Sequence, residues 1–213
     1  MKFKSEMLLL YAVTDRNLSG SNLLNHVEEA LSGGVTLVQL REKSLGLEEF
    51  VDEAVKMRAL CHRYGVPLII NDSVEVAKLS GADGVHVGLV DASVESIRNS
   101  LGRDFIIGAT AKTVERAREC EIAGADYLGV GAVFPSPTKQ SAVRITKEKL
   151  KEICSSVSIP VVAIGGITAQ NVGQIAGAGM DGIAVISGIF ASQFIKNAVS
   201  ELKELARAAV EDR

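Results

Sequence analysis

Short runs rich in β-branched residues alternate along the whole chain with longer segments whose apolar residues recur at helical spacing. The strand-like runs are Leu8–Thr14, Leu37–Glu42, Leu68–Asn71, Gly84–Gly88, Ile106–Ala111, Tyr127–Phe134, Pro160–Ile167 and Gly182–Ser187. The helix-like segments are Asn22–Ser32, Leu47–Tyr64, Ser73–Leu79, Ser93–Leu101, Val114–Ala123, Lys147–Ser155, Ala169–Ala176 and Ala191–Ala209. Strand–helix alternation predicts an α/β fold with a parallel sheet covered by helices. Eight such units predict closure into a (β/α)8 TIM barrel.

Motifs that contain glycine recur before every second strand. They are Ser32-Gly33-Gly34-Val35, Ser80-Gly81-Ala82-Asp83, Ala123-Gly124-Ala125-Asp126 and Gly177-Ala178-Gly179-Met180-Asp181. Glycine after a helix adopts the left-handed conformation without a Cβ penalty, which explains its recurrence there. The main alternative, an open doubly wound sheet, would carry a glycine-rich loop after its first strand, and Thr14-Asp15-Arg16-Asn17 is not one. We therefore expect one single barrel domain over residues 1–213.

Composition limits the partners and the location of the chain. Hydrophobic residues make up 47% of the sequence, enough for a sizeable core, and the formal net charge is −3. That balance gives no general attraction to nucleic acid or to an anionic membrane. Cys61, Cys120 and Cys154 are scattered, so we expect free thiols in a reducing, cytoplasmic compartment. We expect neither a signal peptide nor a bilayer-spanning run, and association into a homo-oligomer stays open.

The strongest local motif is Gln39-Leu40-Arg41-Glu42-Lys43, at the end of the second strand-like run. Because strand side chains alternate between faces, Gln39, Arg41 and Lys43 should point into the barrel and toward its C-terminal mouth. The other face carries Val38, Leu40 and Glu42, and the apolar Val38 and Leu40 should meet the surrounding helices. Two inward cations are costly unless they are neutralised, which favours an anionic ligand. An internal ion-pair network with nearby carboxylates is the structural alternative.

Two carboxylates follow the third and fourth strands. Asp72 comes directly after Asn71, and Asp91 lies in the loop after Gly88. Adjacent strand ends place both carboxylates over the same mouth, and Mg²⁺ favours one or two carboxylates together with waters and phosphate oxygens. These residues predict a Mg²⁺ site. The alternative for both is a role at the start of the following helix, as an N-cap.

Later loops carry features of phosphate sites. Gly165-Gly166-Ile167-Thr168 closes the seventh strand and Ile186-Ser187-Gly188 closes the eighth, which are the usual positions of phosphate loops in such barrels. After the sixth strand, Phe134-Pro135-Ser136-Pro137-Thr138-Lys139 displays two hydroxyls and an ammonium on a proline-stiffened loop. A solvated loop is the alternative there. Thr110, at the end of the fifth strand, should also point its hydroxyl toward the mouth.

The histidines offer no convincing general base. His86, between two glycines of the fourth strand, is expected to be an interior, hydrogen-bonded residue, and a general base is the alternative for it. His26 and His62 belong to helical segments. We find no His/Cys metal cluster, no nucleophile elbow and no Ser-His-Asp arrangement.

Taken in this order, the motifs resemble the thiamine-phosphate synthase family from about Tyr11 to Ile189. The resemblance implies an enzyme, a transferase of thiamine biosynthesis that joins hydroxymethylpyrimidine diphosphate to thiazole phosphate and releases diphosphate. It implies that the pyrimidine diphosphate is held by Gln39, Arg41, Lys43, Asn71, Thr110 and Lys139. It implies Mg²⁺ ligation by Asp72 and Asp91, and a thiazole phosphate site of Ser136, Pro137, Thr138, Gly166, Ile186 and Ser187.

The chemistry of that reaction agrees with the residues. An aminopyrimidine can stabilise a methylene cation, so diphosphate can leave before the thiazole nitrogen attacks. Catalysis then requires charge neutralisation on the diphosphate rather than a strong base, and Mg²⁺ with Arg41, Lys43 and Lys139 can supply it, Thr110 adding a hydroxyl contact. Leu89, where the family often has Gln, departs from the usual pattern, as does Ala132, where it often has Pro.

Three rival functions share this type of barrel. The related thiazole tautomerase uses a His where this chain has Lys112, and it does not need both aspartates, so Lys112 with Asp72 and Asp91 favours the synthase. A regulatory barrel without catalysis would have no reason to keep a charged mouth. A phosphosugar isomerase would need an inward catalytic carboxylate or His pair, which the sequence does not offer.

Overall fold

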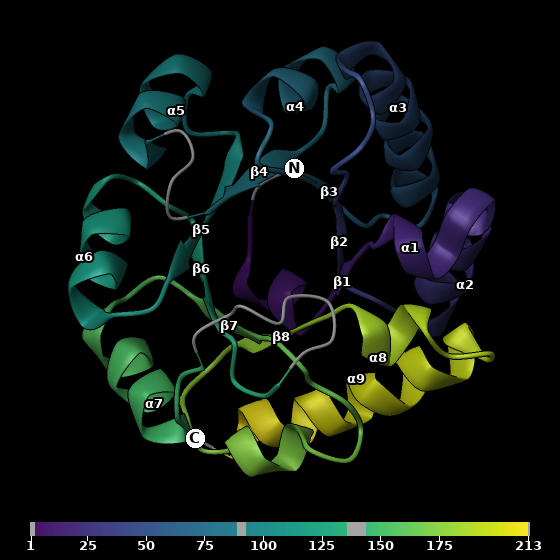
Figure 1. The fold of residues 1–213 in the computed structure, drawn as a ribbon. Helices are drawn as coiled ribbons and strands as arrows, with labels where there is room; N and C mark the ends of the chain where they lie inside the picture. Colours follow the sequence, from purple (N-terminus) through teal and green to yellow (C-terminus); the bar gives the residue numbers. More distant parts are fainter. Residues whose placement is uncertain (1–2, 89–92, 136–143, 213) are drawn as a thin grey trace.

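The computed structural model describes residues 3–88, 93–135 and 144–212. Its strands are β1 (Leu10–Val13), β2 (Leu37–Leu40), β3 (Leu68–Asn71), β4 (Gly84–Val87), β5 (Ile106–Ala111), β6 (Tyr127–Gly131), β7 (Val161–Ile164) and β8 (Gly182–Val185). They form a closed parallel barrel in chain order, in which β8 pairs with β1. Figure 1 shows this ring of strands surrounded by helices. The predicted (β/α)8 barrel is confirmed.

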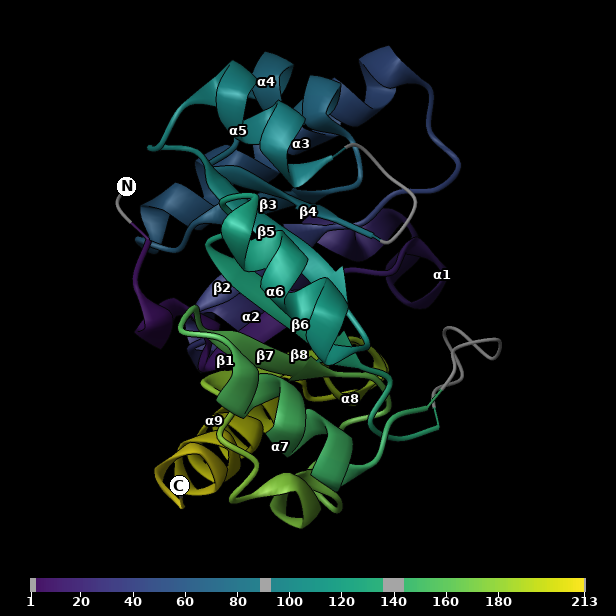
Figure 2. The same ribbon diagram turned by 90° about the vertical axis from the view of Figure 1, so that its left-hand side faces the viewer.

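The described helices cover the outside of the barrel. The α-helices are α1 (Arg16–Ser19), α2 (Leu23–Gly33), α3 (Leu47–Arg63), α4 (Val74–Ser80), α5 (Val94–Leu101), α6 (Val114–Ile122), α7 (Lys147–Ser156), α8 (Ser187–Phe190) and α9 (Ile195–Glu211). The 3₁₀ turns are η1 (Ser5–Leu8), η2 (Gly20–Asn22) and η3 (Val172–Ile175). Figure 2 shows α5, α6 and α7 in chain order along one wall. Within the described residues, no helix has both the length and the apolarity needed to cross a bilayer.

Two predicted helices differ from the structure. The segment predicted as Ala169–Ala176 forms only η3, because Gly173 lies within it and the Asn171 side chain bonds to the backbone of Gly166 and Thr168 instead of continuing a helix. The segment predicted as Ala191–Ala209 is α9, which begins four residues later at Ile195, after the separate short α8. Several strands are also shorter than predicted, among them β1, β6 and β7.

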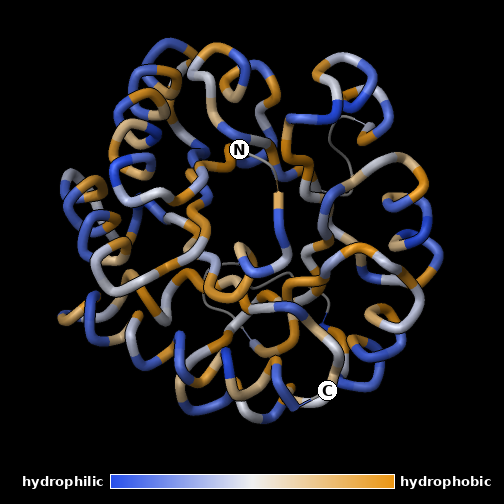
Figure 3. The backbone as a smooth tube through the Cα atoms, turned by 180° about the vertical axis from the view of Figure 1, so that it is seen from behind, coloured by the Kyte–Doolittle hydropathy of each residue, from blue (hydrophilic) through white to orange (hydrophobic). Residues whose placement is uncertain are grey.

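Apolar side chains fill two layers. One cluster lies between strands and helices, and it includes Val38, Leu40 and Ile70 from the outward faces of β2 and β3. The second fills the barrel interior, where Tyr11 and Tyr127 are among the largest buried side chains. Figure 3 shows hydrophobic residues recurring along the strands and along the helices that cover them. The alternation of faces read from the sequence is therefore the one that builds the core.

A hydrogen-bond motif repeats around the N-terminal side of the barrel. The residue that precedes each even-numbered strand accepts a bond from a backbone N–H near the start of the preceding strand. The four bonds are Leu10 N to Thr36 Oγ1 (2.9 Å), Leu68 N to Asp83 Oδ2 (2.8 Å), Ile107 N to Asp126 Oδ2 (2.7 Å) and Val161 N to Asp181 Oδ2 (2.8 Å). Glycines with positive φ, among them Gly34 and Gly81, precede these residues as predicted. The weak sequence repeat thus reflects a repeated strand connection.

Candidate active site

The C-terminal ends of the strands, with the loops that follow them, form what we call the mouth. Gln39 is buried in the interior just below it, where its Nε2 donates to the Tyr11 hydroxyl at 2.6 Å. Arg41 and Lys43 lie beyond the last residue of β2, in the loop. The Arg41 backbone N–H donates to Thr14 Oγ1 at 2.9 Å, so the loop after β1 fixes the start of this segment.

Both cations of the motif have carboxylate partners. Arg41 Nη1 lies 3.3 Å from Asp15 Oδ2, and Lys43 Nζ lies 2.5 Å from Asp72 Oδ2. The two positive and two negative charges balance each other. This arrangement is the ion-pair network that the sequence left open as an alternative. An incoming diphosphate would therefore have to compete with Asp15 and Asp72 for the two cations, unless a metal ion engages the carboxylate of Asp72.

Glu42 lies just beyond β2 and is buried, and its Oε1 accepts from Arg16 Nε at 2.9 Å. Arg16 also pairs with Glu53 of α3. The hydrogen bonds to Glu42 and Glu53 raise the pKa of Arg16, so the guanidinium stays charged. This group ties the loops after β1 and β2 to α3, and it shows that a buried charge on the outer face of a strand needs a partner.

Asp72 lies at the end of β3 with an unusual backbone. Its φ is +62°, in the left-handed region that residues other than Gly rarely adopt. Its N–H donates to His86 O at 2.9 Å, and Asn71 Nδ2 donates to its Oδ1 at 2.9 Å. The predicted alternative, a helix-start role, is wrong for Asp72, because Ser73 is the N-cap of α4 and accepts from Val76 N. Asp72 is thus held at the mouth for another purpose.

Of the residues proposed to bind a metal, Asp72 alone belongs to the described part of the chain. Its carboxylate is 30% exposed, so water and a ligand can reach it. Across residues 3–88, 93–135 and 144–212, His, Cys, Asp and Glu form no group of three or more that could hold a metal ion. Mg²⁺ does not need one, because it is usually held by one or two carboxylates, waters and phosphate oxygens. The donor set at Asp72 therefore fits Mg²⁺ bound together with a phosphorylated ligand.

The ends of β7 and β8 form a second part of the mouth. Residues 164–167, Ala184, Ile186 and Ser187 line a small hollow between them. Gly165 and Gly166 have φ of +105° and +63°, and a Cβ on Gly166 would lie 2.1 Å from Pro135 O. Glycine is required there because the loop after β6 passes directly over the turn. Ser187 begins the short α8, an arrangement that suits phosphate in barrels of this class.

Thr110 lies near the end of β5, and its Oγ1 is 3.1 Å from His86 Nε2. The other ring nitrogen of His86, Nδ1, is 3.2 Å from the Tyr127 hydroxyl. The expectation that His86 is an interior, hydrogen-bonded residue is confirmed. His26 and His62 lie in α2 and α3, also as expected, and His62 Nε2 is 2.8 Å from Asp83 Oδ2.

Several predicted site residues lie outside the described residues. They are Leu89, Asp91, Ser136, Pro137, Thr138 and Lys139. For Asp91, the N-cap alternative loses its main support, because Ser93 is the N-cap of α5 and accepts from Ser96 N. The structure brings the remaining predicted residues to one mouth in two groups. The first group comes from β2, β3, β5 and the loops after β2 and β3, and it consists of Gln39, Arg41, Lys43, Asn71, Asp72 and Thr110. The second group comes from the ends of β7 and β8, and it consists of Gly166, Ile186 and Ser187.

Sequence reasoning missed three residues near this site. Asp15 caps α1 and also holds Arg41, a dual role that only the closed barrel reveals. Tyr11 and Tyr127 contact each other inside the barrel, with their hydroxyls 2.9 Å apart. A usable signal existed for both tyrosines, because each occupies an inward position of its strand by alternation.

Comparisons with known proteins agree with this geometry. The sequence model of a family described as thiamine monophosphate synthase matches residues 10–189. A thiamine-phosphate synthase of Clostridium acetobutylicum is 48% identical over 189 residues, which cover 88% of this chain and 90% of that protein. A thiamine-phosphate synthase of Methanobrevibacter smithii is 44% identical over 92% of this chain and 93% of its own length.

A solved structure is similar over almost the whole chain. The thiamine phosphate pyrophosphorylase of Pyrococcus furiosus superposes with a TM-score of 0.89 and is 38% identical, covering 97% of this chain and 98% of its own. A 3-hexulose-6-phosphate synthase, at 14% identity and a TM-score of 0.66, shares the barrel alone.

Proposed function

This chain belongs to the thiamine monophosphate synthase family, and we propose that the mouth of its barrel is where the transferase reaction of that family takes place. The enzyme condenses hydroxymethylpyrimidine diphosphate with thiazole phosphate to give thiamine phosphate and diphosphate. Its substrates are small molecules. The observation that carries the assignment of the site is the convergence of Arg41, Lys43 and Asp72 on the mouth that Gly166 and Ser187 also line.

In this proposal the pyrimidine diphosphate binds over β2, β3 and β5. Gln39 and Thr110 approach from the interior, and Asn71 from the end of β3. Arg41 and Lys43 turn from Asp15 and Asp72 toward the diphosphate. Lys139 is proposed to add a third cation from the loop after β6. Exchange of one anionic partner for another is feasible here, because the Lys43 side chain is 55% exposed and such pairs contribute little to stability.

We propose that Asp72 and Asp91 hold Mg²⁺ beside the diphosphate. The support is the partly exposed Asp72 carboxylate, fixed by Asn71 at the strand end, and the preference of Mg²⁺ for a small set of carboxylate oxygens. The chemical contribution of the metal would be neutralisation of charge on the diphosphate oxygens. Binding of Mg²⁺ to Asp72 would also release Lys43 from its ion pair, which makes that cation available to the substrate.

The thiazole phosphate is proposed to bind at the ends of β7 and β8. Gly166, Ile186 and Ser187 line the hollow there, and the first backbone N–H groups of α8 have no acceptor within their own helix. Ser136, Pro137 and Thr138 would complete this site from the loop after β6. The closed barrel thus presents two phosphorylated rings to each other, which lowers the entropic cost of the reaction.

Bond breaking is proposed to precede bond making. The C–O bond to diphosphate breaks, the methylene carbon becomes cationic, and the thiazole nitrogen then attacks it. Arg41, Lys43 and Lys139 stabilise the departing diphosphate, while Thr110 and Gln39 hold the ring. His86 is engaged by Thr110 and Tyr127 on its two ring nitrogens, which agrees with a mechanism that uses no general base. We also propose a cytoplasmic location, which is supported by the absence of a disulfide among the described cysteines, Cys61, Cys120 and Cys154.

Genetic complementation tests the proposed function. A bacterial strain that lacks its own thiamine-phosphate synthase grows only when thiamine is supplied. Expression of this chain should restore growth without thiamine, and a chain carrying Asp72→Asn should not. Failure of the folded, expressed wild-type chain to support growth would overturn the proposal.

A further inference from the structure

Five polar side chains form one continuous hydrogen-bond series through the barrel interior, from β2 to β5. Gln39 Nε2 lies 2.6 Å from the Tyr11 hydroxyl, which lies 2.9 Å from the Tyr127 hydroxyl. The Tyr127 hydroxyl lies 3.2 Å from His86 Nδ1, and His86 Nε2 lies 3.1 Å from Thr110 Oγ1. We call this series the interior chain. Its two ends, Gln39 and Thr110, are residues of the proposed pyrimidine diphosphate site.

The direction of every bond in the interior chain follows from its first bond. Because Gln39 donates, Tyr11 accepts and must direct its single proton to Tyr127. Tyr127 in turn directs its proton to His86 Nδ1, which must be unprotonated. His86 then carries its proton on Nε2 and donates it to Thr110 Oγ1. The orientation of the Gln39 amide therefore fixes the tautomer of His86, which lies on β4, two strands away.

Burial keeps the tyrosine protons in place. Tyr11 and Tyr127 are 1% and 0% exposed. Loss of solvation by burial raises the pKa of the Tyr11 hydroxyl and that of the Tyr127 hydroxyl, so both stay protonated. Both bonds that depend on these protons therefore persist over the physiological range.

The His86 and Tyr127 rings pack closely against the glycines of the neighbouring strands. A Cβ on Gly108 would lie 2.2 Å from Tyr127 Cζ and 2.5 Å from His86 Nδ1, and one on Gly129 would lie 2.9 Å from His86 Cε1. Phe3 stacks on Tyr127 from the N-terminal side, with ring centroids 5.6 Å apart. The inward glycines of β5 and β6 thus create the space that the His86–Tyr127 pair fills.

We propose that Tyr11, Tyr127 and His86 are positioning residues that set which hydrogen-bonding groups the mouth offers to the pyrimidine substrate. The interior chain uses the Nε2 of Gln39 and a lone pair of Thr110. It leaves the Gln39 Oε1 as an acceptor and the Thr110 hydroxyl proton as a donor for the ligand. This inference rests on the proposed function, in which both residues hold the pyrimidine diphosphate. The specificity is for a heteroaromatic ligand that matches one acceptor and one donor.

The tautomer of His86 tests the interior chain without any assay of activity. Isotope-labelled histidine gives separate nitrogen resonances for protonated and unprotonated ring nitrogens, and the chain has only three histidines, so His86→Gln identifies the signal. In the ligand-free protein above neutral pH, we expect the Nε2–H tautomer for His86. Tyr127→Phe removes the donor to Nδ1, and the two tautomers should then mix. Finding Nδ1–H in the wild-type protein would overturn the proposed direction.

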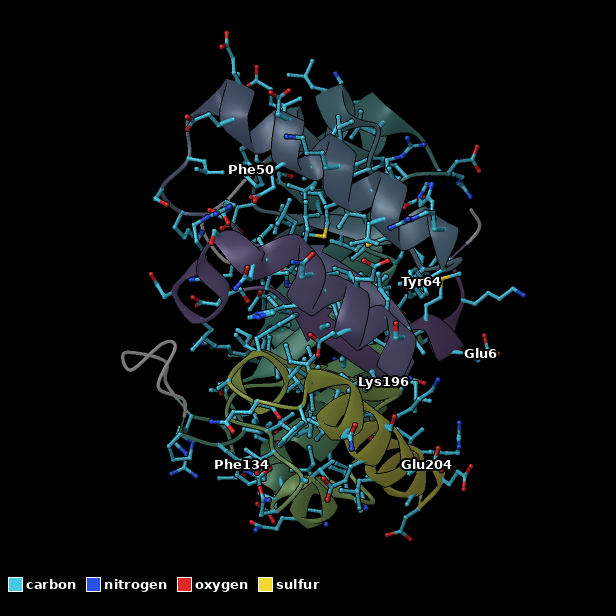
Figure 4. All side chains as sticks on the ribbon, turned by 90° about the vertical axis from the view of Figure 1, so that its right-hand side faces the viewer. Glu6, Phe50, Tyr64, Phe134, Lys196 and Glu204 are labelled. Carbon is cyan, nitrogen blue, oxygen red and sulfur yellow. The ribbon has the colours of Figure 1, made fainter. Side chains whose placement is uncertain are left out.

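Kinetics test what the interior chain does. Tyr127→Phe should raise the KM for the pyrimidine diphosphate roughly tenfold, because it interrupts the interior chain between Tyr11 and His86 and so uncouples the orientations of Gln39 and Thr110. The KM for thiazole phosphate should stay within about twofold. The matched control is Tyr64→Phe. Tyr64 lies at the end of α3, away from the barrel interior (Figure 4), and its hydroxyl bonds only to surface groups. That variant should leave both KM values unchanged.

The outcomes separate this inference from the proposed function. A folded Tyr127→Phe with an unchanged KM for the pyrimidine diphosphate, or with equal changes for both substrates, would overturn the positioning role. If Tyr127→Phe does not fold, Tyr11→Phe breaks the neighbouring bond and must meet the same criterion. If the wild-type chain shows the Nε2–H tautomer but forms no thiamine phosphate, the proposed function fails while the direction of the interior chain is supported.

Discussion

Asp72 combines a left-handed backbone, a hydrogen bond from Asn71 and an ion pair with Lys43 in one residue at the mouth. A left-handed φ at a residue with a Cβ costs about 1–2 kcal/mol. Such strain persists where the surrounding structure imposes it, and it concentrates at functional sites. Since Ser73 caps the following helix, capping does not explain Asp72. We propose that its role is in the chemistry at the mouth.

Asp72→Asn should lower turnover roughly 100-fold or more, because it removes charge from the proposed Mg²⁺ site, and stabilisation by a metal is worth several kcal/mol. Asn tolerates the left-handed backbone, so the thermal unfolding midpoint should change little. Initial rates at saturating Mg²⁺ and thermal unfolding measure the two effects. Asp104→Asn, at an exposed aspartate before β5, is the matched control. Near-normal Mg²⁺-dependent turnover in folded Asp72→Asn would exclude a role in metal binding.

Ser187→Ala should raise the KM for thiazole phosphate roughly tenfold while leaving that for the pyrimidine diphosphate almost unchanged, because one hydrogen bond to an anion is lost. Ser187 lies in the hollow between β7 and β8, and Arg41 and Lys43 belong to the loop after β2. Separate substrate titrations give both constants. Ser200→Ala, on α9, should change neither. An effect confined to the pyrimidine substrate would show that the two phosphate sites are assigned the wrong way round.

Elements of the barrel were predictable where one chain segment determines its own structure. β3 and β5 have the predicted bounds, and α3 begins at the predicted residue, because hydrophobic periodicity and turn residues lie in the sequence itself. Glycines before the even-numbered strands were predictable for the same reason. The segment around η3 was not, because the Asn171 side chain bonds to the backbone of Gly166 and Thr168 just before it, a local turn that hydrophobic periodicity does not reveal.

The residues of the site can also be divided into those that were predictable from one segment and those that were not. Gln39, Asn71 and Thr110 follow from strand ends and alternation. The partners of Arg41, Lys43 and Glu42 do not, because Asp15, Asp72 and Arg16 come from other strand ends or loops, and sequence distance does not show which carboxylate meets which cation. The interior chain likewise joins β1, β2, β4, β5 and β6, so it exists only in the closed barrel.

The repeated strand connection predicts a stability effect at the level of elements. Asp126→Ala should lower the free energy of unfolding by about 2 kcal/mol, because Ile107 N loses its acceptor and Arg98 loses its carboxylate partner. Urea unfolding measures this change. Asp104→Ala, also before β5 but exposed, should be nearly neutral. An equal loss of unfolding free energy in both variants would show that the hydrogen bonds of Asp126 contribute no more to stability than an exposed aspartate does.

At the scale of the whole molecule, we propose that closure of the barrel makes the reaction possible. β8 pairs with β1, so the ends of β7 and β8 lie beside those of β1 and β2 (Figure 1). An open sheet would leave these ends at opposite edges. In the proposed site, two phosphorylated substrates meet over one mouth while their anionic groups are held at different strand ends.

The order of bond breaking and bond making depends on the proposed site as a whole. Replacement of the pyrimidine methyl group by trifluoromethyl should slow single turnover by about 100-fold or more, since it destabilises the cation and each roughly 1.4 kcal/mol is tenfold in rate. Binding should change far less, because Arg41 and Lys43 are assigned to the diphosphate. Single-turnover rates at saturating concentrations measure the chemical step. Comparable rates for the two substrates would favour direct displacement.

The most direct test of the account is the reaction itself, followed with the purified chain. Hydroxymethylpyrimidine diphosphate, thiazole phosphate and Mg²⁺ are mixed with it, and thiamine phosphate and diphosphate are quantified by mass spectrometry and a coupled assay. The account predicts equal amounts of both products, and no product when either substrate or Mg²⁺ is omitted. Absence of thiamine phosphate from the complete mixture, with a folded protein, would contradict it.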